Sequence, residues 1–151
     1  MEAVVIREAR PGDEAAIASL MSQYWAFEQI EGFLEPRAVA LTGWLLRDSN
    51  MGRGWLATES GRPVGYLLAV FVFSLELGGL MAEIDEFFIV PEARSRGTGA
   101  ALLATAEAGL RTAGCVHLQL QLGVANESAR RFYRRQGYAR RAGYELLDKP
   151  L

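Results

Sequence analysis

The stretch that decides the fold runs from Ile84 to Ala100 and reads IDEFFIVPEARSRGTGA. Its first half is an apolar strand pattern that ends at Pro91, and its second half contains Arg-x-x-Gly-x-Gly from Arg94 to Gly99. A helix pattern follows at once. Two glycines let backbone N–H groups approach an anion closely, and a helix N-terminus adds a partial positive charge. The stretch therefore favours a pyrophosphate site, although Gly-x-Gly alone is equally typical of an ordinary strand-to-helix turn.

Two familiar phosphate-binding motifs do not fit this stretch. The dinucleotide fingerprint needs a third glycine, and that position is Leu102. The P-loop needs Gly-Lys-Ser/Thr, and the stretch contains no lysine. The loop must serve another ligand or none.

Strand and helix patterns surround this stretch over the whole chain. Strand patterns cover residues 4–7, 54–58, 64–77, 80–90, 116–122 and 138–147. Helix patterns follow Asp13, which suits an N-cap, then Pro36, the glycine loop and finally Ser128, where the helix covers 128–136. Two helices carry apolar stripes: Ile17, Leu20, Met21 and Tyr24 in one, and Leu102, Leu103, Ala106 and Leu110 in the other.

The order of these elements predicts one mixed α/β domain over residues 1–151. Short turns join the strands of the first half, which predicts antiparallel pairing, and helices join those of the second half, which predicts parallel pairing. The sequence shows no internal repeat, linker or low-complexity segment.

A second motif follows about thirty residues after the loop: Asn126-x-x-Ala129-x-x-Phe132-Tyr133-x-x-x-Gly137-Tyr138. Together with the hydrophobic-x-Pro-Glu segment and the glycine loop, it resembles the GNAT (GCN5-related) N-acetyltransferase superfamily over essentially the whole chain. The likeness is closest to small-amine and polyamine acetyltransferases. One departure is Ser95, where many members have glycine, and this leaves the path of the loop open.

The resemblance implies a single-domain GNAT fold. Its central sheet would be antiparallel in the first half, its fourth and fifth strands would be parallel and splayed, and four helices would flank it. The implied reaction moves an acetyl group from acetyl-CoA, as co-substrate and without a metal, to a primary amine in a ternary complex. Two alternatives stay open: a non-catalytic module that senses acyl-CoA, and an acetyltransferase acting on a protein N-terminus or a lysine.

The resemblance also assigns residues to the cofactor. The main chain of Phe87, Phe88 and Ile89 would pair with the pantetheine arm, and the amide near Ile89 would polarise the thioester carbonyl. Asn126 would contact the cofactor or fix the local backbone. The loop residues that would hold the pyrophosphate are Arg94, Ser95, Arg96, Gly97, Thr98, Gly99 and Ala100.

Acid and base candidates lie on the second motif and on the acidic strand. The resemblance places Tyr133 close to the cofactor sulfur, where a phenol can protonate the leaving thiolate. An amine is protonated at neutral pH, so it must lose a proton first. Alternation along the strand predicts that Glu83 and Asp85 share one face and that Glu86 points to the other. Asp85 is the favoured base and Glu83 is next, while salt bridging to an arginine or a water-relayed path are the alternatives for both.

Composition and charge limit the partners. The net charge of −2 gives no support for a nucleic-acid surface, and no apolar run approaches the length of a membrane helix. With a single cysteine, no intrachain disulfide can form and a zinc site is disfavoured. The expected protein is cytoplasmic and acts on a small-molecule amine, and the resemblance allows a homodimer. Trp25, Trp44 and Trp55 are expected in the core.

Overall fold

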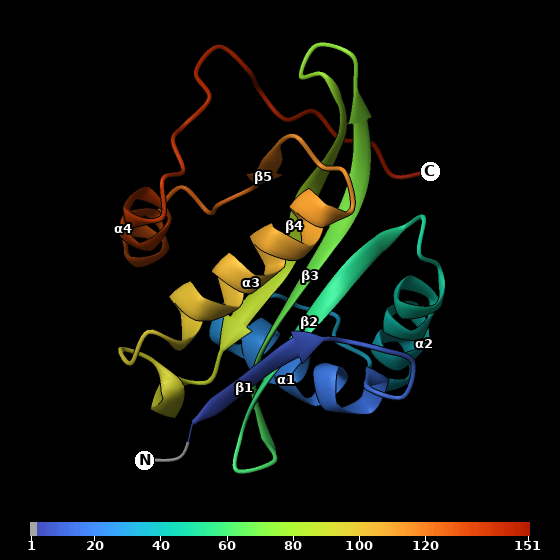
Figure 1. Ribbon diagram of the computed structural model, residues 1–151, viewed down its shortest axis with the longest axis vertical. Helices are drawn as coiled ribbons and strands as arrows, with labels where there is room; N and C mark the ends of the chain where they lie inside the picture. Colours follow the sequence, from blue (N-terminus) through green and yellow to red (C-terminus); the bar gives the residue numbers. More distant parts are fainter. Residues whose placement is uncertain (1–2) are drawn as a thin grey trace. The chain divides into compact units, whose positions relative to one another are not determined.

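The computed structural model describes residues 3–151, which form a mixed α/β structure (Figure 1). The described strands are β1 (Val4–Glu8), β2 (Gly52–Glu59), β3 (Arg62–Ser74), β4 (Gly79–Ile89) and β5 (Leu118–Leu120). The described helices are α1 (Glu14–Phe27), α2 (Glu35–Arg47), the 3-10 helix η1 (Pro91–Ala93), α3 (Thr98–Thr112) and α4 (Glu127–Arg135).

Two compact units divide the chain, one ending at Gln121 and the other covering Leu122–Leu151. The first unit contains the whole sheet with α1, α2 and α3, and the second contains α4. The predicted α/β class is confirmed, and so is the number of α-helices in the described chain, which is four. That residues 1–151 act as one domain stays a prediction.

The sheet has the order β1-β2-β3-β4-β5. The first three pairs are antiparallel and the β4–β5 pair is parallel, as predicted from the connections. A helix connects the parallel pair because two strands that run the same way need a crossover. This crossover is α3, which η1 and the glycine loop connect to the end of β4.

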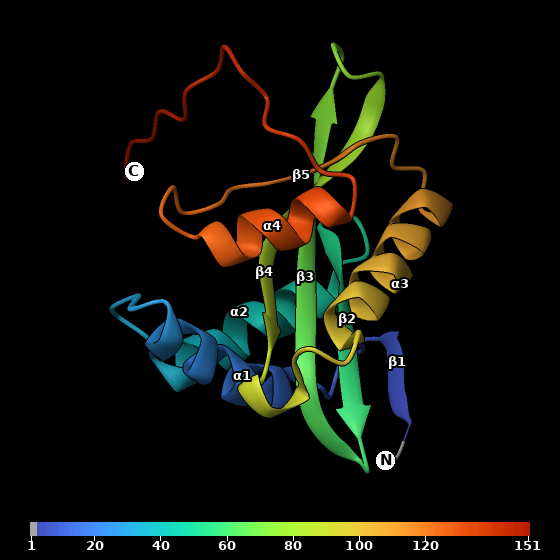
Figure 2. The ribbon, with the colours of Figure 1, turned by 90° about the vertical axis from the view of Figure 1, so that its left-hand side faces the viewer.

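Helices cover both faces of the sheet within the first unit: α3 lies on one face, and α1 and α2 lie on the other (Figures 1 and 2). The stripe predicted on α3 is confirmed, since all four of its residues are buried. On α1, Ile17, Leu20 and Met21 are buried as predicted, while Tyr24, the fourth residue of that stripe, is half-buried. A Cβ atom added to Gly109 on α3 would lie 2.7 Å from Cζ2 of Trp55, so this glycine lets α3 approach β2 closely. Packing of apolar helix stripes on the sheet therefore forms the core.

The strand predicted at residues 138–147 is wrong, because residues 138–151 contain no strand. Its apolar side chains, which include Tyr144, Leu146 and Leu147, are exposed. An extended segment becomes a strand only when a neighbour takes up its backbone hydrogen bonds, and the apolar pattern does not supply that neighbour. The strand predicted at 116–122 is confirmed only over Leu118–Leu120.

Among the described residues, no helix is long and apolar enough to cross a bilayer.

Candidate active site

The glycine loop links the end of β4 to the start of α3. Ser95 and Gly97 both have left-handed backbone conformations, with φ of 61° and 81°. Gly97 is the N-cap residue of α3, and no side chain caps the helix there. The first N–H groups of any α-helix lack partners inside the helix. The start of α3 therefore presents backbone donors to a ligand.

The space beside Gly97 fits this interpretation. Apart from Gly97 and its chain neighbours, no heavy atom of the described residues lies within 4 Å of a Cβ added to Gly97, so there is open space beside the loop at that point. Backbone N–H groups, a helix N-terminus and open space together suit a phosphate group. The residues present therefore fit the pyrophosphate of coenzyme A.

The two arginines of the loop contact the protein in this structure. Nε of Arg94 donates to the carbonyl of Ile89 at 2.8 Å, and its guanidinium lies 4.7 Å from the ring centroid of Phe27 and 5.3 Å from that of Phe88. Arg94 thus joins the end of α1 to the end of β4.

Arg96 makes a bidentate ion pair with Glu59 on β2, at 2.9 and 3.2 Å. It also donates to the carbonyl of Glu92 at 3.2 Å. Both arginines were predicted as cofactor contacts, and that role stays a prediction. In this structure their contacts connect the loop to α1, β2 and β4.

The parallel ladder between β4 and β5 is short. Its pairs are Ala82–Leu118, Glu83–Gln119 and Ile84–Leu120, whereas β4 continues to Ile89. Phe88 and Ile89 are buried in this continuing half, and Tyr24 of α1 packs edge-on against Phe88 at 5.7 Å between ring centroids. The main-chain segment predicted to pair with pantetheine thus lies beyond the end of this ladder.

A β-bulge interrupts the acidic part of β4. Leu68 of β3 pairs with Glu86 and Ala69 pairs with Ile84, so Asp85 is the extra residue. Bulges re-aim side chains and are frequent beside active sites. The regular alternation assumed from the sequence therefore does not continue through Asp85.

The two carboxylates predicted as bases differ in how they are held. Glu83 is half-buried and accepts a hydrogen bond from Nε2 of Gln121 at 3.1 Å. Asp85 is exposed, and no hydrogen bond to its carboxylate occurs in the described part of the chain. Desolvation by nearby protein atoms and the charge of Glu83 raise the pKa of Asp85, while water reaching its exposed side chain limits that effect.

Glu86 is the carboxylate that sequence reasoning did not select. Its Oε1 accepts hydrogen bonds from Nε1 of Trp25 at 3.0 Å and from the hydroxyl of Tyr66 at 3.2 Å. Burial is the main cause that raises its pKa to about 7, the charge of Asp85 adds to the increase, and the two hydrogen bonds oppose it. In the sequence, the only indication of this residue was its position directly before Phe87 and Phe88. Its hydrogen-bond donors, Trp25 and Tyr66, become neighbours of Glu86 only in the folded chain.

The aromatic residues around Glu86 come from α1 and β3. Burial, followed by the charge of Glu86, raises the pKa of Tyr24 to about 12. The same two causes raise the pKa of the fully buried Tyr66 well above its usual range. Both phenols therefore stay protonated at neutral pH.

Core packing was predicted for all three tryptophans. The prediction is confirmed for Trp55, which is buried, and wrong for Trp44, which is 57% exposed. Trp25 is half-buried beside Glu86.

The second unit positions Tyr133 and Asn126 locally. Oδ1 of Asn126 accepts a hydrogen bond from the backbone N–H of Ala129 at 3.1 Å, which caps α4. The ring of Tyr133 lies edge-on between Phe132 and Tyr138, at 5.3 and 5.5 Å between centroids. Asn126 thus fixes the local backbone, one of its two predicted roles, and the chemical role of Tyr133 stays a prediction.

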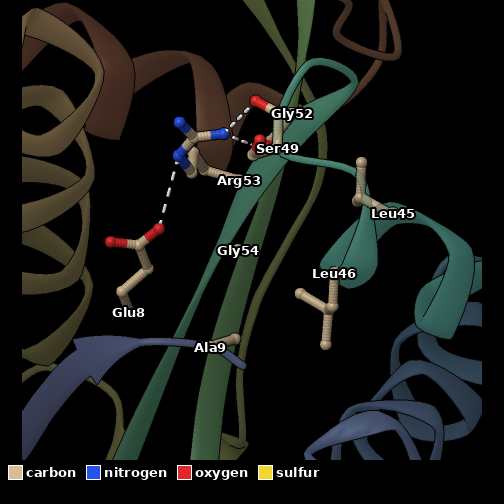
Figure 3. Close-up of a pocket in the computed structure, with 8 residues that line it drawn as sticks. All are labelled: Glu8, Ala9, Leu45, Leu46, Ser49, Gly52, Arg53 and Gly54. Carbon is tan, nitrogen blue, oxygen red and sulfur yellow. Dashed lines mark hydrogen bonds and ion pairs between the residues drawn. The ribbon is translucent and has the colours of Figure 1, made fainter. Parts of the chain in front are cut away.

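A separate hollow lies between α2 and the first strands (Figure 3). Arg53 is its prominent polar side chain, and it already pairs with Glu8 at 3.4 Å and donates to the carbonyls of Ser49 and Gly52. Its guanidinium also lies 5.1 Å from the ring centroid of Phe71. These contacts give Arg53 a structural role.

A glycine loop of this kind could bind a ligand or simply connect a strand to a helix, and comparison with known proteins distinguishes these possibilities. Residues 16–138 match the profile of the Acetyltransferase (GNAT) family. The chain belongs to this family. The GNAT fold and an acyltransferase activity follow, so the alternative of a non-catalytic module is set aside.

Relatives of this GNAT acetyltransferase support the same assignment. It is 31% identical over 141 residues to the Uncharacterized N-acetyltransferase YhfO of Bacillus subtilis, and the match covers 92% of each chain. It is 35% identical over 83 residues to the Aminoalkylphosphonate N-acetyltransferase of Salmonella typhimurium, over 55% of this chain and 54% of that protein. A crystal structure of an integron cassette protein from the mobile metagenome of Cole Harbour Salt Marsh has a TM-score of 0.83 and 33% identity, covering 97% of this chain and 90% of that one.

Proposed function

We propose that this enzyme transfers an acetyl group from acetyl-CoA directly to the primary amine of a cationic small molecule, with both substrates bound together. The observation that carries the proposal is the uncapped start of α3 behind the left-handed residues Ser95 and Gly97. This arrangement suits a pyrophosphate, and in a GNAT acetyltransferase the matching ligand is coenzyme A.

The chain's own groups would hold and orient this co-substrate. Backbone N–H groups from Ser95 to Ala100 would bind the pyrophosphate, and the main chain of Phe87, Phe88 and Ile89 would bind the pantetheine arm. The co-substrate supplies an acetyl thioester, which an amine can attack. The backbone N–H near Ile89 would stabilise the carbonyl oxygen as it gains charge.

Proton transfers complete the proposed reaction. Tyr133 would protonate the departing thiolate, and a carboxylate of β4, with Asp85 and Glu83 as the sequence candidates, would take a proton from the amine. Glu83, Asp85 and Glu86 place three carboxylates within four residues of β4, which would attract a cationic acceptor. The similarity to the Aminoalkylphosphonate N-acetyltransferase of Salmonella typhimurium supports a small amine as acceptor.

Release of the coenzyme A thiol across a panel of amines tests the proposal. The panel contains spermidine, cadaverine, aminoethylphosphonate, kanamycin and a peptide with an unblocked N-terminus. We expect amine-dependent thiol release with at least one small amine. Release with the peptide alone would instead indicate a protein acceptor, and no release with any amine would refute the proposal.

Tyr133→Phe tests the acid assignment with the amine that works. Removing the phenol proton should lower kcat about 100-fold or more while acetyl-CoA affinity changes little. Tyr144→Phe, an exposed tyrosine in the same unit, is the matched control and should leave kcat unchanged. An unchanged kcat in Tyr133→Phe would exclude the acid role.

A further inference from the structure

We infer that Glu86 accepts the proton that the acceptor amine loses before it attacks, and that Trp25 and Tyr66 are positioning residues for its carboxylate. This inference rests on the proposed function. It goes beyond that function by assigning the base to a residue other than Asp85 and Glu83, and by giving two aromatic residues a defined part in the reaction.

The hydrogen-bond pattern of Glu86 supports the assignment. Both donors, the indole N–H of Trp25 on α1 and the phenol of Tyr66 on β3, bind the same oxygen, Oε1. Within residues 3–151, no hydrogen bond to Oε2 occurs. Glu86 is half-buried, so its side chain is held by two elements and is still reachable from solvent. One oxygen is thus fixed and the other can accept a proton.

The donors are themselves rigid. Tyr66 is fully buried, and the ring of Trp25 packs edge-on against Phe33 at 5.7 Å between centroids. Side chains locked by packing hold a reactive group within the narrow geometry that catalysis needs. Neither rival carboxylate is held in this way among the described residues: Asp85 is exposed, and the carboxylate of Glu83 accepts one side-chain hydrogen bond, from the exposed Gln121.

Position along β4 also favours Glu86. It directly precedes the Phe87–Ile89 segment that is proposed to bind pantetheine next to the thioester. Glu83 instead lies within the β4–β5 ladder, three residues earlier. A carboxylate adjacent to the proposed thioester site needs a smaller movement of the amine between losing its proton and attacking.

Burial, helped by the charge of Asp85, keeps Glu86 basic enough for this task. The titratable groups that act on its pKa are Asp85 on its own strand and Tyr66 on β3, while the charge of Glu86 in turn raises the pKa of Tyr24 on α1. No cation is among the groups that act on its pKa in the described chain. With a pKa of about 7, Glu86 is largely ionised at pH 8 and is a far stronger base than an ordinary carboxylate.

The proposed step balances as follows. An ammonium proton moves to Oε2 of Glu86, the nitrogen lone pair forms a bond to the thioester carbon, and the C–S bond breaks. The thiolate takes a proton from Tyr133, the second nitrogen proton restores the phenol through water, and Glu86 returns its proton to solvent. The net products are the amide, the thiol of coenzyme A and one proton.

The test uses acetyl-CoA with the panel amine that gives turnover and compares pH profiles. In wild type, kcat/KM should rise through a limb near pH 7. Glu86→Gln keeps an oxygen that can accept from Trp25 and Tyr66, and it should lower kcat about 100-fold or more and remove that limb. Glu83→Gln should keep the limb in place. Asp85→Asn should keep the limb but move it to lower pH, because the charge of Asp85 raises the pKa of Glu86.

A second pair of variants tests the positioning role. Removing the indole N–H in Trp25→Phe takes away a hydrogen bond that lowers the pKa of Glu86, so the limb should move to higher pH. Trp44→Phe makes the same substitution at an exposed site on α2 and should leave the limb in place. If the limb of the kcat/KM profile lies at the same pH in Trp25→Phe as in wild type, the positioning role is refuted.

The outcomes separate the inference from the function on which it rests. Turnover with an unaltered limb in Glu86→Gln, or loss of the limb in Asp85→Asn or Glu83→Gln, would overturn the assignment of Glu86 alone. A rise in KM with unchanged kcat in Glu86→Gln would also overturn it, because Glu86 would then only bind the ammonium group. No turnover with any panel amine would refute both.

Discussion

Backbone strain in the glycine loop gives a prediction that needs no knowledge of the acceptor. Ser95 and Gly97 have φ of 61° and 81°. For a residue with a Cβ, the left-handed conformation costs about 1–2 kcal/mol, whereas glycine adopts it readily. Gly97→Ala should therefore destabilise the protein, and Ser95→Gly should stabilise it.

The magnitude follows from the structure. In the part of the chain that the structure describes, a Cβ added to Gly97 meets no heavy atom within 4 Å beyond its chain neighbours, so no steric clash adds to the conformational cost. A non-glycine residue also restricts the unfolded chain, which offsets about 0.4–1 kcal/mol. The net change is about 1 kcal/mol in each direction. For a chain of this size, that corresponds to a Tm shift of roughly 2–4 °C, downward for Gly97→Ala and upward for Ser95→Gly.

Thermal and urea unfolding would measure these shifts, and calorimetric titration with acetyl-CoA would measure the effect on the loop. Gly123→Ala is the matched control, since Gly123 has neither a positive φ nor a crowded Cβ position, and it should not lower Tm. Acetyl-CoA affinity should fall in Gly97→Ala and persist in Ser95→Gly. A Gly97→Ala protein as stable as wild type, or a Ser95→Gly protein that is less stable, would refute this account of the loop.

Three further predictions concern packing and charge. Gly109→Ala would place a methyl group 2.7 Å from the buried ring of Trp55, and the forced repacking should cost about 1–3 kcal/mol in urea unfolding; an unchanged midpoint would contradict the close approach of α3 to β2. Arg94→Met removes the hydrogen bond to Ile89 and the contacts with Phe27 and Phe88, so it should lower the free energy of unfolding by about 1–2 kcal/mol. The control Arg37→Met, at an exposed site on α2, should lower it by less than about 0.5 kcal/mol. The pKa of Glu86 in the folded state, about 7, is above its ordinary value of 4.5. The contribution of this residue to the free energy of unfolding is therefore fully present below pH 4.5, where its carboxyl is protonated, and is lost as the pH rises through 7. Glu86→Gln should therefore be about 1–2 kcal/mol more stable than wild type at pH 8, allowing for its partial exposure, with little difference at pH 4; equal urea midpoints at both pH values would show that the pKa is not raised.

The stability predicted for Glu86→Gln has a functional meaning. A half-buried carboxylate that keeps its charge at pH 8 destabilises the fold, and functional sites are where such destabilising features are retained. Loss of turnover together with a gain in stability would identify Glu86 as a residue kept for chemistry. A loss of both would indicate a structural residue.

Short-range sequence patterns determined much of this protein. The stripes of α1 and α3 were predicted with their buried residues, and the Arg94–Gly99 loop was placed correctly between β4 and α3. Helix periodicity, capping and the left-handed preference of Gly97 depend on a few neighbouring residues, so they can be read locally. The pairing of the loop with the Asn126–Tyr138 motif pointed to the family.

Only the tertiary structure showed which carboxylate of β4 accepts hydrogen bonds from two distant side chains. Trp25 is 61 residues from Glu86 and Tyr66 is 20 residues from it, so no local pattern links the three. The bulge at Asp85 depends on the register between β3 and β4, which strand alternation does not reveal. The missing strand at residues 138–147 has the same origin, because a strand requires a partner for its backbone hydrogen bonds and the sequence of one segment does not supply it. Periodicity within a segment is a local property, whereas pairing, desolvation and the pKa of a buried group arise only when distant segments meet.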